Sequence, residues 1–152
     1  MRIVGIDHGD RHFGLALSDE DEFIATPHDV LHGEQEVIDE IEALIQDEGV
    51  GLIVVGLPLN MDGSIGPRAR KVEAFRDRLS VRFGLPIELW DERLTTLQAE
   101  QALRASGLSA RKRRDRVDKV AAQILLQSFL DSRSESSDNT EAGSGEESVS
   151  ER

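Results

Sequence analysis

The chain has 152 residues and no cysteine, so it is long enough to bury one hydrophobic core, and disulfides and thiolate metal sites are excluded. Its formal net charge of −12 by itself argues against a nucleic-acid partner. The charge is unevenly divided, however, with −13 over residues 1–67, +6 over residues 68–119 and −5 over residues 120–152. A basic middle segment is typical of proteins that bind a polyanion, although solvated helices of different charge would give the same pattern.

The chain also lacks the signals of a membrane or secreted protein. The apolar run at its N-terminus is too short for a signal peptide, and no stretch of roughly 18 apolar residues occurs that could span a bilayer. We therefore expect a soluble, cytoplasmic protein that does not associate with a membrane.

The first part of the chain predicts four strands and one helix. Arg2–Asp7 and Phe13–Ser18 are short apolar runs around a glycine-bracketed connection, which predicts a β-hairpin, and a third strand is expected over Glu22–Val30. Between Gly33 and Glu48, apolar residues recur at helical spacing with acids between them, which predicts an amphipathic helix. The continuous apolar run Leu52–Gly56 is typical of a strand that is buried on both faces.

The second part predicts three helices and a fifth strand. After a loop rich in Pro, Asn, Asp and Gly, a helix is expected over Pro67–Phe83, since proline suits a first helical turn. Pro86–Trp90 is expected to be a strand, and a capping box at Thr95 predicts a helix that ends near Ser106. Residues 117–130 are apolar almost all round, which predicts a buried helix.

The composition changes abruptly after Asp131. Ser132–Arg152 consists mainly of Ser, Glu, Asp and Gly, which is typical of a disordered acidic tail. Residues 1–131, with their order of strands and helices, predict a single α/β domain built on a mixed β-sheet flanked by helices. Sites in open α/β sheets lie beyond the carboxyl ends of the strands. We therefore expect the ends of the first, fourth and fifth strands to form the site.

Three carboxylates lie at the edges of apolar elements, namely Asp7, Glu92 and Asp118. An acid in such a place is costly unless it is paired or binds a cation. Converging carboxylates are typical of Mg²⁺ sites, whose usual chemistry is phosphoryl transfer. Taken singly, Asp7 also fits a turn residue, Glu92 fits part of a surface ion pair and Asp118 fits a first-turn acid that favours a helix dipole.

Four motifs resemble, in order, those of the YqgF/RuvX family. They are Gly5-Ile6-Asp7-His8-Gly9 with the following Gly14–Asp19, Val55–Gly63, Asp91–Thr96 and Val117–Ala122. The resemblance extends over residues 1–131. It implies the ribonuclease H-like fold and a nuclease, described in the family as a Holliday junction resolvase and as the enzyme that processes the 5′ end of the small-subunit (pre-16S) rRNA precursor.

The resemblance assigns Asp7, Glu92 and Asp118 as the catalytic and metal-binding residues of a site for Mg²⁺ or Mn²⁺. If two ions bind, Asp7 is expected to bridge them, because the end of a strand fixes it rigidly. Two positions depart from the family pattern. His12 replaces a basic residue, so phosphate binding there would depend on pH. Gly56 stands where ribonuclease H-like enzymes tend to carry an acid, and Asp62 is the nearest substitute.

The candidate nucleic-acid contacts are basic residues, or loop residues near the three acids: Arg11, His12, Asn60, Arg93, Arg111, Lys112, Arg113 and Arg114. The dense cluster at 111–114 suits phosphate contacts, with a solvated linker as the alternative. The chain has one Trp, five Phe and no Tyr, so recognition of the backbone and of shape is favoured over base stacking.

The sequence therefore favours a metal-dependent nuclease that acts on rRNA precursors, with ribosomal particles as further partners, as a monomer or a homodimer. A junction resolvase is one alternative, and it would need a homodimer because two strands must be cut. A non-catalytic nucleic-acid-binding module on the same fold is another. The segment from Asp7 to Gly14 also resembles the first phosphate loop of the actin and sugar-kinase superfamily, but the chain is too short for that superfamily's second domain.

Overall fold

The computed structural model describes residues 1–93, 95 and 120–134. Five strands form one sheet in the order β3-β2-β1-β4-β5. Their bounds are β1 (Arg2–His8), β2 (Phe13–Ser18), β3 (Ala25–Leu31), β4 (Val50–Leu57) and β5 (Ile87–Asp91). β1 pairs antiparallel with β2 and parallel with β4, β2 pairs antiparallel with β3, and β4 pairs parallel with β5. The predicted hairpin and the predicted mixed sheet are thus confirmed.

Two helices make the crossovers that parallel strands require. α1 (Glu34–Glu48) leads into β4 and α2 (Pro67–Phe83) leads from β4 into β5. Both end at glycines in the left-handed conformation, Gly49 at φ 70° and Gly84 at φ 67°, where a Cβ would be strained. Bidentate hydrogen bonds from Arg78 to Glu34 (2.7 and 2.8 Å) join the two helices.

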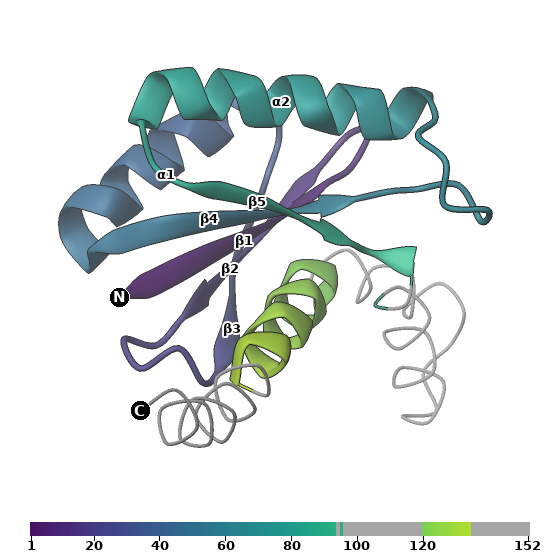
Figure 1. Ribbon diagram of the computed structural model, residues 1–152. Coiled ribbons are helices and arrows are strands. Elements are labelled where there is room, and N and C mark those ends of the chain that lie inside the picture. The colour runs from purple at the N-terminus through teal and green to yellow at the C-terminus, as the bar shows by residue number, and fades with distance from the viewer. Residues whose placement is uncertain (94, 96–119, 135–152) are drawn as a thin grey trace, which may run out of the picture.

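Two hydrophobic layers lie on opposite faces of the sheet. α1 and α2 cover one face, and the helix at 120–134 covers the other (Figure 1). Because side chains alternate along a strand, Val4 and Ile6 of β1 belong to the layer under α1 and α2, whereas Ile3 belongs to the layer under the helix at 120–134. Both faces of β4 are buried, as predicted from its continuous apolar run.

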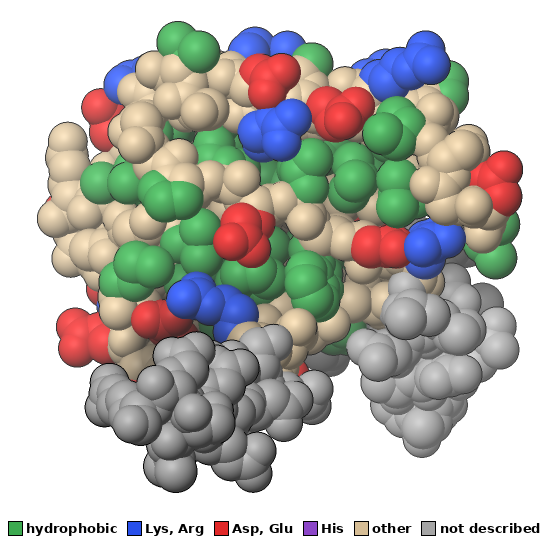
Figure 2. All heavy atoms as spheres, viewed as in Figure 1, with side chains coloured by type: hydrophobic (Ala, Val, Ile, Leu, Met, Phe, Trp, Pro, Cys, Tyr) green, Lys and Arg blue, Asp and Glu red, His purple; other side chains and the backbone are tan. Residues whose placement is uncertain are grey.

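The surface of α2 is basic. Its sequence carries five arginines and one lysine, and Lys and Arg side chains gather along its outer side in Figure 2. None of the helices in the described ranges is long and apolar enough to span a membrane.

Three sequence predictions need correction, two at the boundaries of elements and one in the burial of a helix. β3 begins at Ala25 rather than Glu22, because the Asp19 carboxylate accepts hydrogen bonds from the backbone N–H groups of Phe23 and Ile24 and holds a turn there. The last described helix continues to residue 134, beyond its predicted end at residue 130. It also buries one side rather than its whole circumference, since Leu126 is fully buried and Ile124 is only partly so. The predicted helix from Thr95 to Ser106 and residues 135–152 of the tail lie outside the described residues, so the two-part division of the chain stays a prediction.

Candidate active site

Asp7 occupies the next-to-last position of β1, opposite Gly14 of β2. Ile6 before it faces α1 and α2, so alternation along the strand directs Asp7 to the face covered by the helix at 120–134. Gly5 lies on that same face, where a Cβ would be only 2.8 Å from Cβ of Leu126. The helix therefore approaches the sheet closely just beside Asp7.

Glu92 follows the last residue of β5, and its backbone is fixed at both ends. Its N–H donates to the carbonyl oxygen of Leu57 at the end of β4 (3.3 Å), and its own carbonyl accepts a hydrogen bond from the Thr95 hydroxyl (2.9 Å). Its side chain lies over β4, because a Cβ on Gly56 would be 2.5 Å from Oε2 of Glu92. The carboxylate thus occupies the space that a side chain at Gly56 would fill.

The two carboxylates affect each other electrostatically. Burial, and then the negative charge of Asp7, raise the pKa of Glu92 from 4.5 to about 7, while the positive charge of Arg68 opposes the rise. Like charges that share a partly buried site favour either a proton or a cation between them. Asp7 and Glu92 therefore stay the described candidates for a cation site.

The donor set fits Mg²⁺ or Mn²⁺, because both ions prefer hard carboxylate oxygens. Within the described ranges no group of three or more His, Asp or Glu side chains is placed to hold an ion. Two of the three predicted ligands, Asp7 and Glu92, lie in these ranges. The third, Asp118, lies outside the described residues.

Glu92 occupies the space beside Gly56, where the resemblance leads us to expect an acid in the fourth strand. Gly56 leaves room for a carboxylate that comes from the end of the neighbouring strand, since Gly56 pairs with Trp90, two residues before Glu92. Asp62, the other possible substitute, has a structural role. Its exposed carboxylate accepts hydrogen bonds from the Ser64 N–H (2.9 Å) and hydroxyl (2.6 Å), and these bonds lower the pKa of Asp62.

Asp91 and Arg93, on either side of Glu92, form the ion pair that the motif suggested (2.6 Å). Hydrogen bonds from Arg93 lower the pKa of Asp91. Arg93 also donates a hydrogen bond to the Met61 carbonyl oxygen (3.3 Å), in the loop after β4. The ion pair therefore links β5 to this loop and leaves Glu92 out of the pairing.

The other candidate contacts are distributed over the same edge of the sheet. Arg11 is exposed in the turn after β1. His12 lies next to His32, with 3.1 Å between their Nδ1 atoms, and the Asn60 amide donates to the Ser64 hydroxyl (3.0 Å) in the loop after β4. The basic cluster at 111–114 lies outside the described residues.

Arg68 is a residue near the site that the sequence analysis does not single out. It lies in the first turn of α2, where its charge opposes the rise in the pKa of Glu92 and adds to the lowering of the pKa of His8. Its position directly after Pro67, where the loop from β4 enters α2, could have indicated a place near the site. His8 itself packs against the rings of Phe13 and Phe75 at centroid distances of 4.8 and 5.0 Å, and burial lowers the pKa of His8.

Comparison with known proteins assigns the family. Residues 1–132 match the family model described as "RuvX: Holliday junction resolvase". The chain belongs to the RuvX family. A relative from Pelotomaculum thermopropionicum is 50% identical over 135 residues, which cover 87% of this chain and 88% of the relative, and one from Geobacillus thermodenitrificans is 43% identical over 137 residues, which cover 88% and 99%. Both carry the name "Putative pre-16S rRNA nuclease".

Two solved structures share the fold of this RuvX protein. RuvC of T. thermophilus, in a complex with a Holliday junction substrate, matches with a TM-score of 0.51 and 19% identity over 88% of this chain and 96% of RuvC. The Holliday junction resolvase of fowlpox virus matches with a TM-score of 0.51 and 12% identity over 87% of this chain and 99% of the resolvase. The predicted ribonuclease H-like fold and the predicted enzyme class, a nuclease, are confirmed.

Proposed function

We propose that this chain is a metal-dependent nuclease of the cytoplasm that hydrolyses a phosphodiester bond in maturing the 5′ end of pre-16S rRNA. Asp7, Glu92 and Asp118 would be its catalytic, metal-binding residues. The observation that carries the proposal is the carboxylate of Glu92, which lies over Gly56 and whose pKa is raised by burial and by Asp7. A cation removes the electrostatic cost of this arrangement.

The residues of the chain have separate tasks in this reaction. Asp7 and Glu92 would hold Mg²⁺ or Mn²⁺ from two directions, because β1 fixes one and the end of β5 fixes the other. The bound ion would activate water and offset the charge that develops on the phosphate. Arg68, whose charge already acts on Glu92, would attract the anionic substrate, and the candidate contacts Arg11, His12, Asn60, Arg93 and Arg111–Arg114 would orient its backbone.

The substrate assignment rests on the relatives. Proteins that are 43–50% identical over nearly the whole domain are named for pre-16S rRNA, whereas the likeness to RuvC, at 19% identity, concerns the fold. Cleavage of one RNA strand needs one site, so a monomer suffices, and ribosomal particles that contain the precursor would be natural partners.

The proposal is tested by cleavage of three substrates with Mg²⁺ or Mn²⁺: a precursor 5′ segment, an unrelated linear RNA and a four-way DNA junction. Asp7→Asn and Glu92→Gln should each lower the rate by at least 100-fold, since each removes a charge from the metal site. Asp10→Asn and Glu88→Gln are matched controls, because both side chains are exposed, and they should cut normally.

Preferential cutting of the precursor supports the rRNA assignment. Junction resolution is the second candidate, since it is the description of the matching family, and it predicts preferential cutting of the junction by a homodimer. If the acid variants cut as well as the unaltered protein, the assigned site is wrong. If neither protein cuts but both bind RNA tightly, the chain is a binding module.

A further inference from the structure

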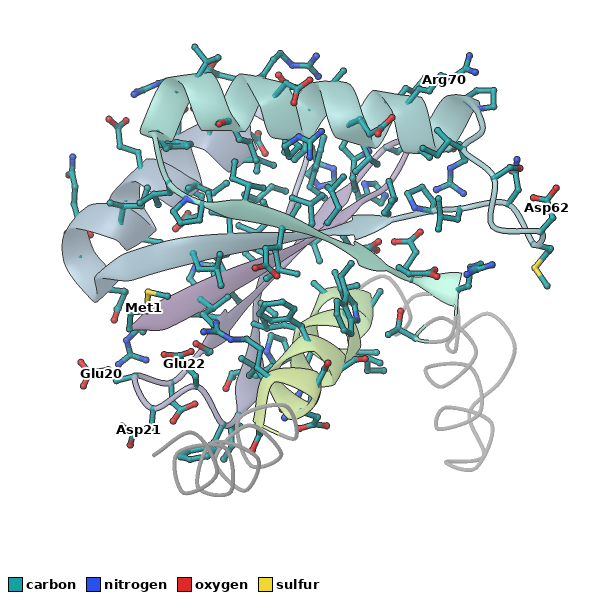
Figure 3. All side chains as sticks on the ribbon, in the orientation of Figure 1. Met1, Glu20, Asp21, Glu22, Asp62 and Arg70 are labelled. Atoms are coloured by element: carbon teal, nitrogen blue, oxygen red, sulfur yellow. The ribbon has the colours of Figure 1, made fainter. Side chains whose placement is uncertain are left out.

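The loop between β4 and α2 presents apolar side chains at the edge where the site lies. Met61 is 92% exposed and Ile65 is 45% exposed. The loop projects beyond the ends of β4 and β5 (Figure 1), and Figure 3 shows Asp62, the neighbour of Met61, at its tip, away from the core. Of the large hydrophobic side chains exposed in the described ranges, Met61 is the most exposed.

Met61 lies in a hydrogen-bonded turn. The Asn60 N–H donates to the Ser64 carbonyl oxygen (3.0 Å), and the Gly63 N–H donates to the Asn60 carbonyl oxygen (2.8 Å). The Asp62 carboxylate accepts from the backbone and side chain of Ser64, and Gly63 has a φ of 87°, which glycine adopts without strain. This hydrogen bonding holds the side chain of Met61 away from the core.

Hydrogen bonds from two consecutive residues, Glu92 and Arg93, also connect this loop to the carboxylate site. Glu92 donates its backbone N–H to Leu57, just before the loop, and Arg93 donates a hydrogen bond from Nη1 to the Met61 carbonyl oxygen (3.3 Å). The Asp91–Arg93 ion pair (2.6 Å) holds the guanidinium in place. The position of Met61 relative to Glu92 is therefore fixed by bonds to adjacent residues.

We propose that Met61 positions the substrate by packing against an unpaired nucleobase next to the phosphodiester that is cut. This inference rests on the proposed function and specifies its substrate as a strand with an unstacked base. A thioether is polarizable and packs favourably on aromatic rings, and contacts to the face of a base tolerate any sequence. A phosphodiester held near Asp7 and Glu92 brings its own bases to the neighbouring loop, which makes a base a better occupant than a protein partner.

The test is binding of a single-stranded RNA that carries one 2-aminopurine, placed in turn at each position around the cleavage site. Met61→Ala should weaken binding about 3- to 10-fold and should reduce the 2-aminopurine fluorescence change at one position. Met61→Leu, which keeps an apolar side chain of similar volume, should restore most of the affinity. Val81→Ala is the matched control, since Val81 is 89% exposed on α2, and it should leave binding unchanged.

Removal of the base identified in this way should abolish the difference in RNA affinity between the Met61→Ala variant and the unaltered protein, because both changes delete the same contact. Equal binding by the two proteins, or the same loss on the abasic strand, would overturn the proposal, as would absence of any binding by the unaltered protein. Binding is measured without cleavage. A protein that binds through Met61 but does not cut would therefore refute the nuclease proposal and leave the Met61 contact established.

Discussion

The perturbed acid Glu92 makes a prediction about stability that needs no substrate. In the unfolded chain its carboxyl group has an ordinary pKa of 4.5, and in the fold burial and the charge of Asp7 raise that pKa to about 7. At 1.36 kcal/mol per pKa unit, the difference corresponds to at most about 3 kcal/mol of the free energy of unfolding. The replacement Glu92→Gln keeps the shape of the side chain and removes the charge.

The sign follows from proton binding in the two states. Below pH 4.5 Glu92 is protonated in both states and costs nothing. Between pH 4.5 and 7 the unfolded chain releases this proton while the folded protein keeps it, so Glu92 lowers the free energy of unfolding as the pH rises, and above pH 7 its full cost is present. We therefore expect Glu92→Gln to stabilise the protein by up to about 3 kcal/mol at pH 8 and to have little effect at pH 4.5.

The measurement is urea unfolding at pH 4.5, 6 and 8 in EDTA, followed by tryptophan fluorescence. Trp90 is the only tryptophan. It packs edge-on against Phe129 at a centroid distance of 5.4 Å and donates a hydrogen bond to the Ser128 hydroxyl (3.2 Å), so its emission reports loss of the contact between β5 and the helix at 120–134. Glu88→Gln on the same strand is the control for loss of an exposed charge.

A variant no more stable than the unaltered protein at pH 8, or one equally stabilised at pH 4.5, would show that the pKa of Glu92 is not raised in the folded protein. Millimolar Mg²⁺ should reverse the order at pH 8, because a ligand that binds only the folded state stabilises it and the variant has lost one of the ligands. Stabilisation of both proteins to the same extent by Mg²⁺ would show that the ion binds elsewhere.

Two further variants test the surroundings of Glu92. Gly56→Ala places a Cβ 2.5 Å from Oε2 of Glu92 and 3.2 Å from Cδ2 of Leu125. In urea unfolding it should destabilise the fold by about 1–3 kcal/mol, and in single-turnover assays it should lower the cleavage rate at least 10-fold. Normal cleavage would show that Glu92 need not lie over Gly56. Arg68→Ala removes the charge that opposes the rise in the pKa of Glu92, so the rising limb of the pH–rate profile should move to higher pH. Arg78→Ala is its control, because Arg78 pairs with Glu34 on α1, and an unmoved profile in the Arg68 variant would contradict the assigned electrostatics.

Local sequence signals were enough for most of the fold. The bounds of α2 are those predicted, because Pro67 begins the helix and Gly84 ends it in a conformation that suits glycine. The start of β3 was misplaced because it depends on one side chain, Asp19, that holds a turn through hydrogen bonds to backbone groups four and five residues later. Apolar pattern carries no information about such bonds.

The sequence predicts the residue types of the candidate site and only part of its geometry. The motifs singled out Asp7 and Glu92, and the order of the strands places both at one edge of the sheet. The contact between Glu92 and Gly56 could not be read from the sequence, because it requires the register that pairs Gly56 of β4 with Trp90 of β5. The same is true of Arg68, whose effect on Glu92 depends on how α2 lies across the sheet.

We propose above that Asp7 and Glu92 hold the catalytic metal ion. The most direct test is Mn²⁺ binding at pH 8, measured by electron paramagnetic resonance on samples that are then assayed for cleavage of the precursor rRNA segment. We expect Asp7→Asn and Glu92→Gln to lose tight Mn²⁺ binding and cleavage together, while Glu88→Gln keeps both. Undiminished Mn²⁺ binding and cleavage in the Asp7 and Glu92 variants would contradict this expectation.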